Sequence, residues 1–166
     1  MRQAVNNTGI NENLNHQRWV LVANAAGAKL FESNGVAYKF VKEIDHPEGR
    51  KQNRELRTDR HGRAANLGAP VGGTGRMSRQ AFSTAVEPKE HEAELFAKSL
   101  AEILESGRTS NQFNELILVA NPWFMGKLKM FLTHNTSKCL VESYEKDFAN
   151  TPPNTLPNVL SSLIDK

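Results

Sequence analysis

Arginine side chains that could bind phosphate groups are concentrated in the middle of this sequence. Residues 50–79, called the basic segment below, hold eight basic side chains against two acidic ones, whereas residues 1–49 are balanced and residues 80–166 are net acidic. A guanidinium group donates paired hydrogen bonds that fit phosphate oxygens, so a phosphate-rich partner would favour such a segment. A solvated loop whose charge serves only solubility has the same composition, and both interpretations stay open at this level.

Two adjacent glycines accompany these arginines. They let the backbone approach a crowded partner closely, and the arginines that follow could hold a phosphate chain. The basic segment contains no Phe, Tyr or Trp for base stacking, so contacts with an RNA should involve its backbone or its folded shape. The candidate RNA- or phosphate-binding residues are Arg50, Arg54, Arg57, Arg60, Arg63, Gly72, Gly73, Arg76 and Arg79.

Motifs for catalysis or metal binding are scarce. The five histidines lack the spacing of a metal site, which predicts that they are surface residues. Asp45, Asp59 and Asp147 are spread too widely to indicate a two-metal nuclease. The glycine-rich run at residues 72–75 lacks the lysine and the spacing of a Walker motif. We therefore expect no catalytic residue, no metal site and no cofactor.

Length and composition predict one domain in the cytosol. A chain of 166 residues suits a single core. Residues 1–17 are predicted to be a flexible leader without the apolar run of a signal peptide, and no longer stretch approaches the roughly 18 apolar residues of a membrane span. The single cysteine, Cys139, cannot form an internal disulfide and is predicted to be a buried structural thiol.

The first half of the sequence predicts strands followed by a loop. Residues 19–23 and 28–32 read as two strands with a tight reversal, and residues 36–44 as a third antiparallel strand after an Asn-Gly turn. At about residues 48–86 the apolar periodicity disappears and glycines accumulate, which predicts a long basic loop.

The second half predicts alternating helices and strands. A helix should begin at Glu87 and end near Gly107, and its apolar stripe would consist of Leu95, Phe96, Leu100, Ile103 and Leu104. The elements expected next are a buried strand at 115–120, a helix capped by Asn121 and Pro122, a strand at 139–144 and a helix at 158–164. The order β-β-β-loop-α-β-α-β-α predicts an α/β fold in residues 18–166, with a five-stranded mixed sheet of ribonuclease-H-like layout.

Several blocks of the sequence resemble the bacterial host attachment protein family. These blocks are residues 19–32, 57–63, 116–126 and 146–157. The resemblance covers roughly residues 18–165 and implies a protein related to attachment to host cells, in a group that also includes release-factor-like proteins.

A second, narrower resemblance concerns the two glycines of the basic segment. The residues that carry it are Gly72, Gly73, Arg76, Arg79, Phe82 and His91. They are similar to the Gly-Gly-Gln loop and the following helix in the middle domain of eukaryotic and archaeal class-one release factors, where the loop promotes hydrolysis of peptidyl-tRNA. Thr74 stands at the glutamine position, and a hydroxyl group does not reproduce an amide's geometry, so this resemblance implies RNA approach without hydrolysis.

Two functions of different classes follow from these features. The first is a cytosolic, release-factor-like protein that binds ribosomal or transfer RNA through the basic segment without clear catalysis. The second, implied by the family name, is an attachment factor whose partner is a host or cell-surface component. The lack of a predicted export signal favours the first function.

Overall fold

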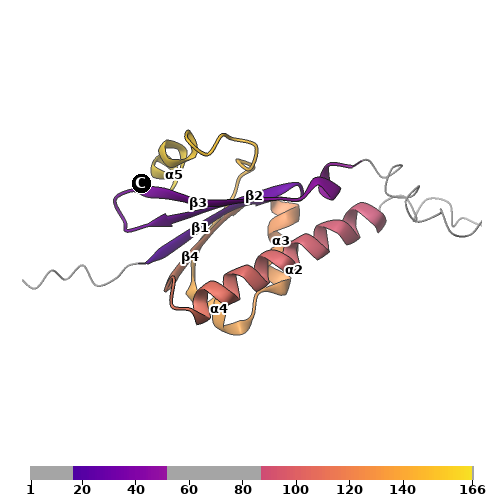
Figure 1. Ribbon diagram of the computed structural model, residues 1–166, viewed down its shortest axis with the longest axis horizontal. Helices are drawn as coiled ribbons and strands as arrows, with labels where there is room; N and C mark the ends of the chain where they lie inside the picture. Colours follow the sequence, from indigo (N-terminus) through magenta and orange to yellow (C-terminus); the bar gives the residue numbers. More distant parts are fainter. Residues whose placement is uncertain (1–16, 52–86, 166) are drawn as a thin grey trace, which may run out of the picture.

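A mixed sheet of five strands forms the centre of the protein, which a computed structural model describes over residues 17–51 and 87–165 (Figure 1). The strands are β1 (Arg18–Asn24), β2 (Gly27–Ser33), β3 (Tyr38–Asp45), β4 (Glu115–Ala120) and β5 (Leu140–Glu145). Their order is β3-β2-β1-β4-β5. β2 is antiparallel to both β1 and β3, whereas β4 is parallel to both β1 and β5. The predicted five-stranded mixed sheet is therefore confirmed.

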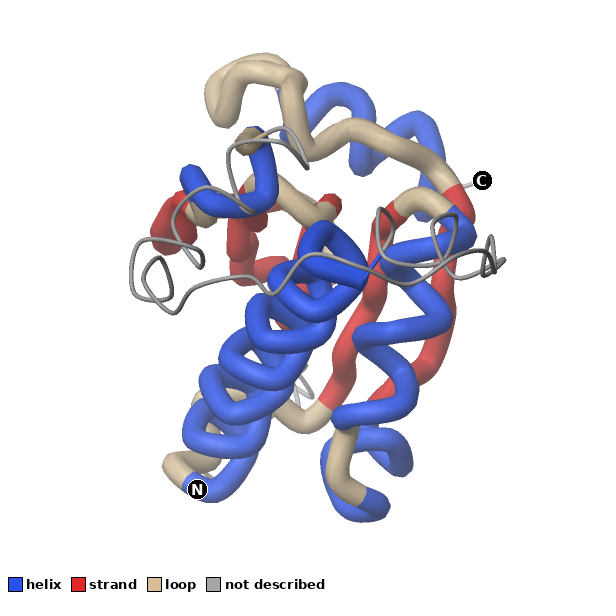
Figure 2. The backbone as a smooth tube through the Cα atoms, turned by 90° about the vertical axis from the view of Figure 1, so that its right-hand side faces the viewer, coloured by secondary structure: helices blue, strands red, loops and turns tan. Residues whose placement is uncertain are grey.

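Helices cover both faces of this sheet. Those on one face are α2 (Glu87–Thr109), α3 (Pro122–Phe131) and α4 (His134–Cys139), and α5 (Leu156–Ile164) lies on the other (Figures 1 and 2). The sequence pattern indicated all of these helices except α4, which is short and contains mostly polar residues. Two boundaries also differ, since α2 continues two residues past Gly107 and α5 begins at Leu156 rather than at residue 158.

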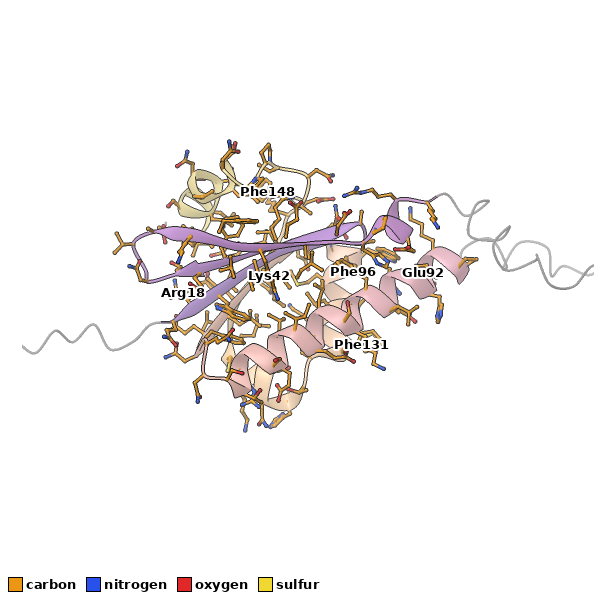
Figure 3. The ribbon with its side chains drawn as sticks, viewed as in Figure 1. Arg18, Lys42, Glu92, Phe96, Phe131 and Phe148 are labelled. Carbon is orange, nitrogen blue, oxygen red and sulfur yellow. The ribbon has the colours of Figure 1, made fainter. Side chains whose placement is uncertain are left out.

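Side chains alternate between the two faces of the sheet along each strand, so the core has two layers. Trp19 and Leu21 of β1 pack with α2 and α3, whereas Val20 and Val22 pack with α5. β4 is buried on both faces, which explains why its sequence is apolar nearly throughout. The labelled phenylalanines of Figure 3 illustrate the two layers, because Phe96 lies between α2 and the sheet and Phe148 lies beyond the opposite face.

The turn between β2 and β3 forms as the sequence predicts. Gly35 has a φ of 87°, a conformation that glycine adopts without a steric cost. The side chain of Asn34 accepts hydrogen bonds from the backbone N–H groups of Val36 and Ala37, at 3.1 and 3.2 Å. These bonds keep the two residues in the turn, so β3 begins at Tyr38.

Two predictions about side-chain burial are wrong. Leu95 was expected on the apolar stripe of α2, yet it is 48% exposed. The buried stripe consists of Ala93, Phe96, Ala97, Leu100, Ala101 and Leu104. Alanines four residues apart form one face of α2 and let this face pack closely on the sheet. Leu95 lies on a different face of the helix and points toward solvent. Cys139 is only partly buried, because it ends α4 beside β5, an edge strand of the sheet.

Glu105 joins the end of α2 to the start of α4. Its carboxylate accepts hydrogen bonds from Arg108 Nη2 at 2.6 Å, from Thr133 Oγ1 at 2.8 Å and from the hydroxyl of the buried Thr136. These hydrogen bonds lower the pKa of Glu105 from an ordinary value of 4.5 to about 2, and the bond from Arg108 has the largest effect.

We expect Glu105→Gln to destabilise the protein at neutral pH and to have a smaller effect in acid. A carboxyl group whose pKa is lower in the folded state stabilises the fold above its unfolded pKa, and this contribution is lost as the pH falls from 4.5 to about 2. Urea unfolding of both proteins at several pH values measures the difference in free energy of unfolding. Glu102→Gln, at an exposed position of the same helix, is the control. A difference that persists unchanged at pH 2 would contradict the prediction.

Candidate functional site

The structure describes the two points at which residues 52–86, which contain most of the basic segment, join the domain. Of the predicted binding residues, Arg50 lies within the described ranges. Those outside them are Arg54, Arg57, Arg60, Arg63, Gly72, Gly73, Arg76 and Arg79. The chain enters this region after η1 (Pro47–Arg50), a short 3-10 helix at the end of β3, and leaves it at the first residue of α2. Both points lie at the same end of the domain (Figures 1 and 2).

Backbone contacts fix η1 against the turn between β1 and β2. The N–H of His46 donates to the carbonyl oxygen of Ala26 at 3.0 Å, and the N–H of Gly49 donates to the carbonyl oxygen of His46 at 3.1 Å. Gly49 lies so close to Ala25 that a Cβ atom on this glycine would be 1.9 Å from the Ala25 carbonyl oxygen. The position therefore requires glycine for close approach of two backbones.

His46 connects η1 to α2. Its ring stacks on Phe96 with a centroid distance of 4.5 Å and an interplanar angle of 7°. The prediction that the histidines are surface residues is wrong for this one, because 15% of its side chain is exposed. Its Nε2 atom is buried and has no hydrogen-bond partner among the described residues. The stack holds together the two elements between which residues 52–86, with most of the basic segment, are connected.

A polar pocket of about 180 Å³ lies beside η1, at the carboxyl end of β1. Its lining residues are Asn24, Ala26, Gly27, Lys29, Glu43, Arg50, Ala149 and Asn150. Lys29 is buried there, with Nζ donating to the carbonyl oxygen of Ala149 and lying 3.3 Å from Glu43 Oε1. A buried ammonium needs such partners, so this lysine fastens the β5–α5 connection to β2.

Arg50 is the cation of this pocket that can exchange partners. Its Nη2 lies 2.6 Å from Asp45 Oδ1, and more than half of each side chain is exposed. An exposed ion pair contributes no more than about 1 kcal/mol, so a phosphate group can replace the carboxylate of Asp45 at small cost. This arrangement is compatible with the predicted phosphate-binding role of Arg50.

The start of α3 lies next to the start of α2. Asn121 caps α3 as predicted, its side-chain oxygen accepting from the N–H of Phe124 at 2.9 Å. Lys127 Nζ then reaches α2, at 2.7 Å from Glu90 Oε1 and 3.1 Å from Glu94 Oε1. Burial lowers the pKa of Lys127, but the hydrogen bonds that it donates to the two carboxylates and the negative charges of these groups together raise it more, so the net shift is upward and the lysine stays charged.

Trp123 is the exposed aromatic side chain of this region, and sequence reasoning did not assign it a role. It is 47% exposed, and Lys127 Nζ lies 5.2 Å from the centroid of its ring. Its position directly after the capping proline could have indicated that its side chain is exposed. The helical period places Phe124 toward the core, and a residue one position earlier points about 100° away from it.

A larger pocket, of about 310 Å³, lies at the other end of the strands. Arg18 and Gln112 contribute to its lining, together with residues of the β2–β3 turn such as Asn34. Arg18 is held by an ion pair with Glu115 at 2.7 Å. This pocket is far from η1 and from the start of α2, so it is a separate feature from the attachment points of the basic segment.

Comparisons with known proteins identify a family. The family model described as "Protein required for attachment to host cells" matches residues 19–160. No match was found among curated proteins. Across residues 17–51 and 87–165, no helix has the length and apolar character needed to cross a membrane. In the same ranges, no three His, Cys, Asp or Glu side chains are grouped so that they could hold a metal ion.

Proposed function

The chain belongs to the family of proteins required for attachment to host cells, and on this premise we propose that it binds structured RNA through its basic segment in the cytosol. The observation that carries the proposal is the concentration of cationic charge, since residues 50–79 are strongly basic while the rest of the chain is neutral or acidic. The proposed role is binding without hydrolysis of peptidyl-tRNA, because Thr74 stands where the similar release-factor loop has glutamine.

The described residues support this proposal through the attachment points of the segment. The close approach of Gly49 to Ala25 holds η1 against the β1–β2 turn, and the His46–Phe96 stack holds η1 against α2. A segment fixed at both ends loses less conformational freedom on binding than a free tail does, so its arginines can contact phosphates at a smaller entropic cost.

A second candidate function follows from the description of the family. That description favours a partner on a host or cell surface, and the protein would then be an attachment factor. The arginines of the basic segment could contact an anionic surface component as well as RNA, so charge alone does not separate the two functions. The location of the native protein in cells separates the two functions.

We expect the native protein to migrate with ribosomes when cells are fractionated at low salt, and to dissociate from them at high salt. Salt weakens contacts between arginine and phosphate because the counterions released on binding gain less entropy when the bulk salt concentration is higher. Ribonuclease treatment before fractionation is the control, and it should move the protein to the light fractions. Recovery of the protein at the cell surface, accessible to added protease and absent from ribosomes, would favour the attachment function instead.

A further inference from the structure

The two tryptophans of this chain differ in environment. Trp19 is 3% exposed and stacks on Phe113 with a centroid distance of 4.7 Å, so it is part of the core. Trp123 is 47% exposed in the first turn of α3. A large aromatic side chain left half in water contributes little to the fold through its exposed part, but that part can contact a ligand.

The indole of Trp123 is held by charged neighbours. Lys127 lies over its ring, and Lys127 is in turn fixed by Glu90 and Glu94 of α2. A cation over the ring stabilises it through its quadrupole, and nearly half of the side chain is exposed and can contact another flat group. The ring is therefore oriented before any ligand binds, which reduces the conformational entropy that binding would cost.

Local charge indicates which chemical group would stack there. Lys127 supplies one positive charge, whereas Glu90 and Glu94 together supply two negative charges, so a phosphate gains nothing at this position. An uncharged aromatic ring is not repelled. Nucleobases stack on exposed aromatic side chains in this way, whatever their sequence, because every base has a π face.

We propose that Trp123 is a stacking site for an unpaired nucleobase of the RNA partner, an inference that rests on the proposed function. Glu90 lies three residues after the first residue of α2, so the indole is close to the point where the chain returns from the basic segment. Arginines would then contact phosphates while Trp123 contacts a base. Stacking also supplies the aromatic contact that residues 50–79 lack.

The test uses the full chain and two RNAs of equal length, a hairpin with unpaired adenines in its loop and a blunt duplex. A dye on the RNA reports binding, and tryptophan fluorescence reports stacking. We expect the hairpin to quench the fluorescence and the duplex to leave it unchanged, because Trp19 is buried. Trp123→Ala should weaken hairpin binding about tenfold, and Trp123→Phe should restore most of it because a phenyl ring still stacks.

Met130→Ala is the matched control, since Met130 is 78% exposed on the same helix but has no aromatic ring. It should bind the hairpin as the native chain does. Hairpin binding without quenching, or unchanged binding by Trp123→Ala, would overturn the stacking role and leave the proposed function intact. An equal loss in Met130→Ala would also overturn it, because a side chain without an aromatic ring would then matter as much for hairpin binding. Failure of both RNAs to bind would refute the proposed function and this inference together.

Discussion

Gly49→Ala is expected to lower the free energy of unfolding by about 3 kcal/mol, the upper part of the usual range for inserting a methyl group into a packed site. The new Cβ atom would lie 1.9 Å from the carbonyl oxygen of Ala25 and 2.7 Å from its carbonyl carbon. Both are backbone atoms, so a rotamer change cannot relieve the overlap. The 3-10 helix η1 must move away from the β1–β2 turn, and the ring of His46, 3.0 Å from the same position, must move with it.

Gly126→Ala is the matched control for this substitution. A Cβ atom on Gly126, in the middle of α3, would meet no heavy atom within 4 Å apart from its chain neighbours and the backbone of its own helix. Alanine has a higher helix propensity than glycine, so this variant should gain up to about 1 kcal/mol. Urea denaturation of the three proteins gives the comparison. A Gly49→Ala protein as stable as the native chain would show that η1 does not need this close approach.

Simultaneous replacement of Arg57, Arg60 and Arg63 by alanine is expected to weaken RNA binding and its dependence on salt. Each phosphate contact that is lost reduces the slope of log affinity against log salt by about 0.7 to 0.9, so three contacts would reduce it by about 2 to 3. The three arginines recur at every third residue within the basic segment. Binding of a labelled structured RNA at several salt concentrations measures both quantities.

A variant that loses three positive charges outside the basic segment separates the effect of local phosphate contacts from the effect of net charge. Lys39 and Lys42 on β3 and Lys98 on α2 are exposed, and their replacement by alanine removes three cations without touching the basic segment. The salt slope of this control should stay close to that of the native chain. Equal salt slopes in the arginine variant and the native chain would show that the basic segment does not bind RNA. The absence of RNA binding at low salt would show the same.

Most of the helices and strands were predicted from local signals, which are patterns of residues that lie close together in the sequence. The Asn34-Gly35 turn, the Asn121 cap and the apolar run of β4 each specify their own conformation. The same local signals gave the order of strands and helices, from which the mixed sheet follows. Helix α4 was missed because its residues are mostly polar, and its start is marked only by Thr133, whose side chain accepts from the N–H of Thr136.

Side chains whose surroundings come from distant parts of the chain were the ones that sequence reasoning misjudged. His46 is buried because Phe96, fifty residues later, stacks on its ring. Leu95 is exposed because the alanines of α2 decide which helical face meets the sheet. No pattern within a few residues encodes either outcome, since both depend on how the helix packs against the sheet.

The sequence by itself determined the concentration of positive charge in residues 50–79, the family resemblance and the order of helices and strands along the chain, because composition and periodicity are properties of neighbouring residues. Only the tertiary structure decided which groups meet at the two attachment points of that segment. Lys127 meets Glu90 and Glu94 across two helices, and Trp123 is held beside them. Such contacts form when the packing of α2 and α3 on the sheet brings distant side chains within hydrogen-bonding distance.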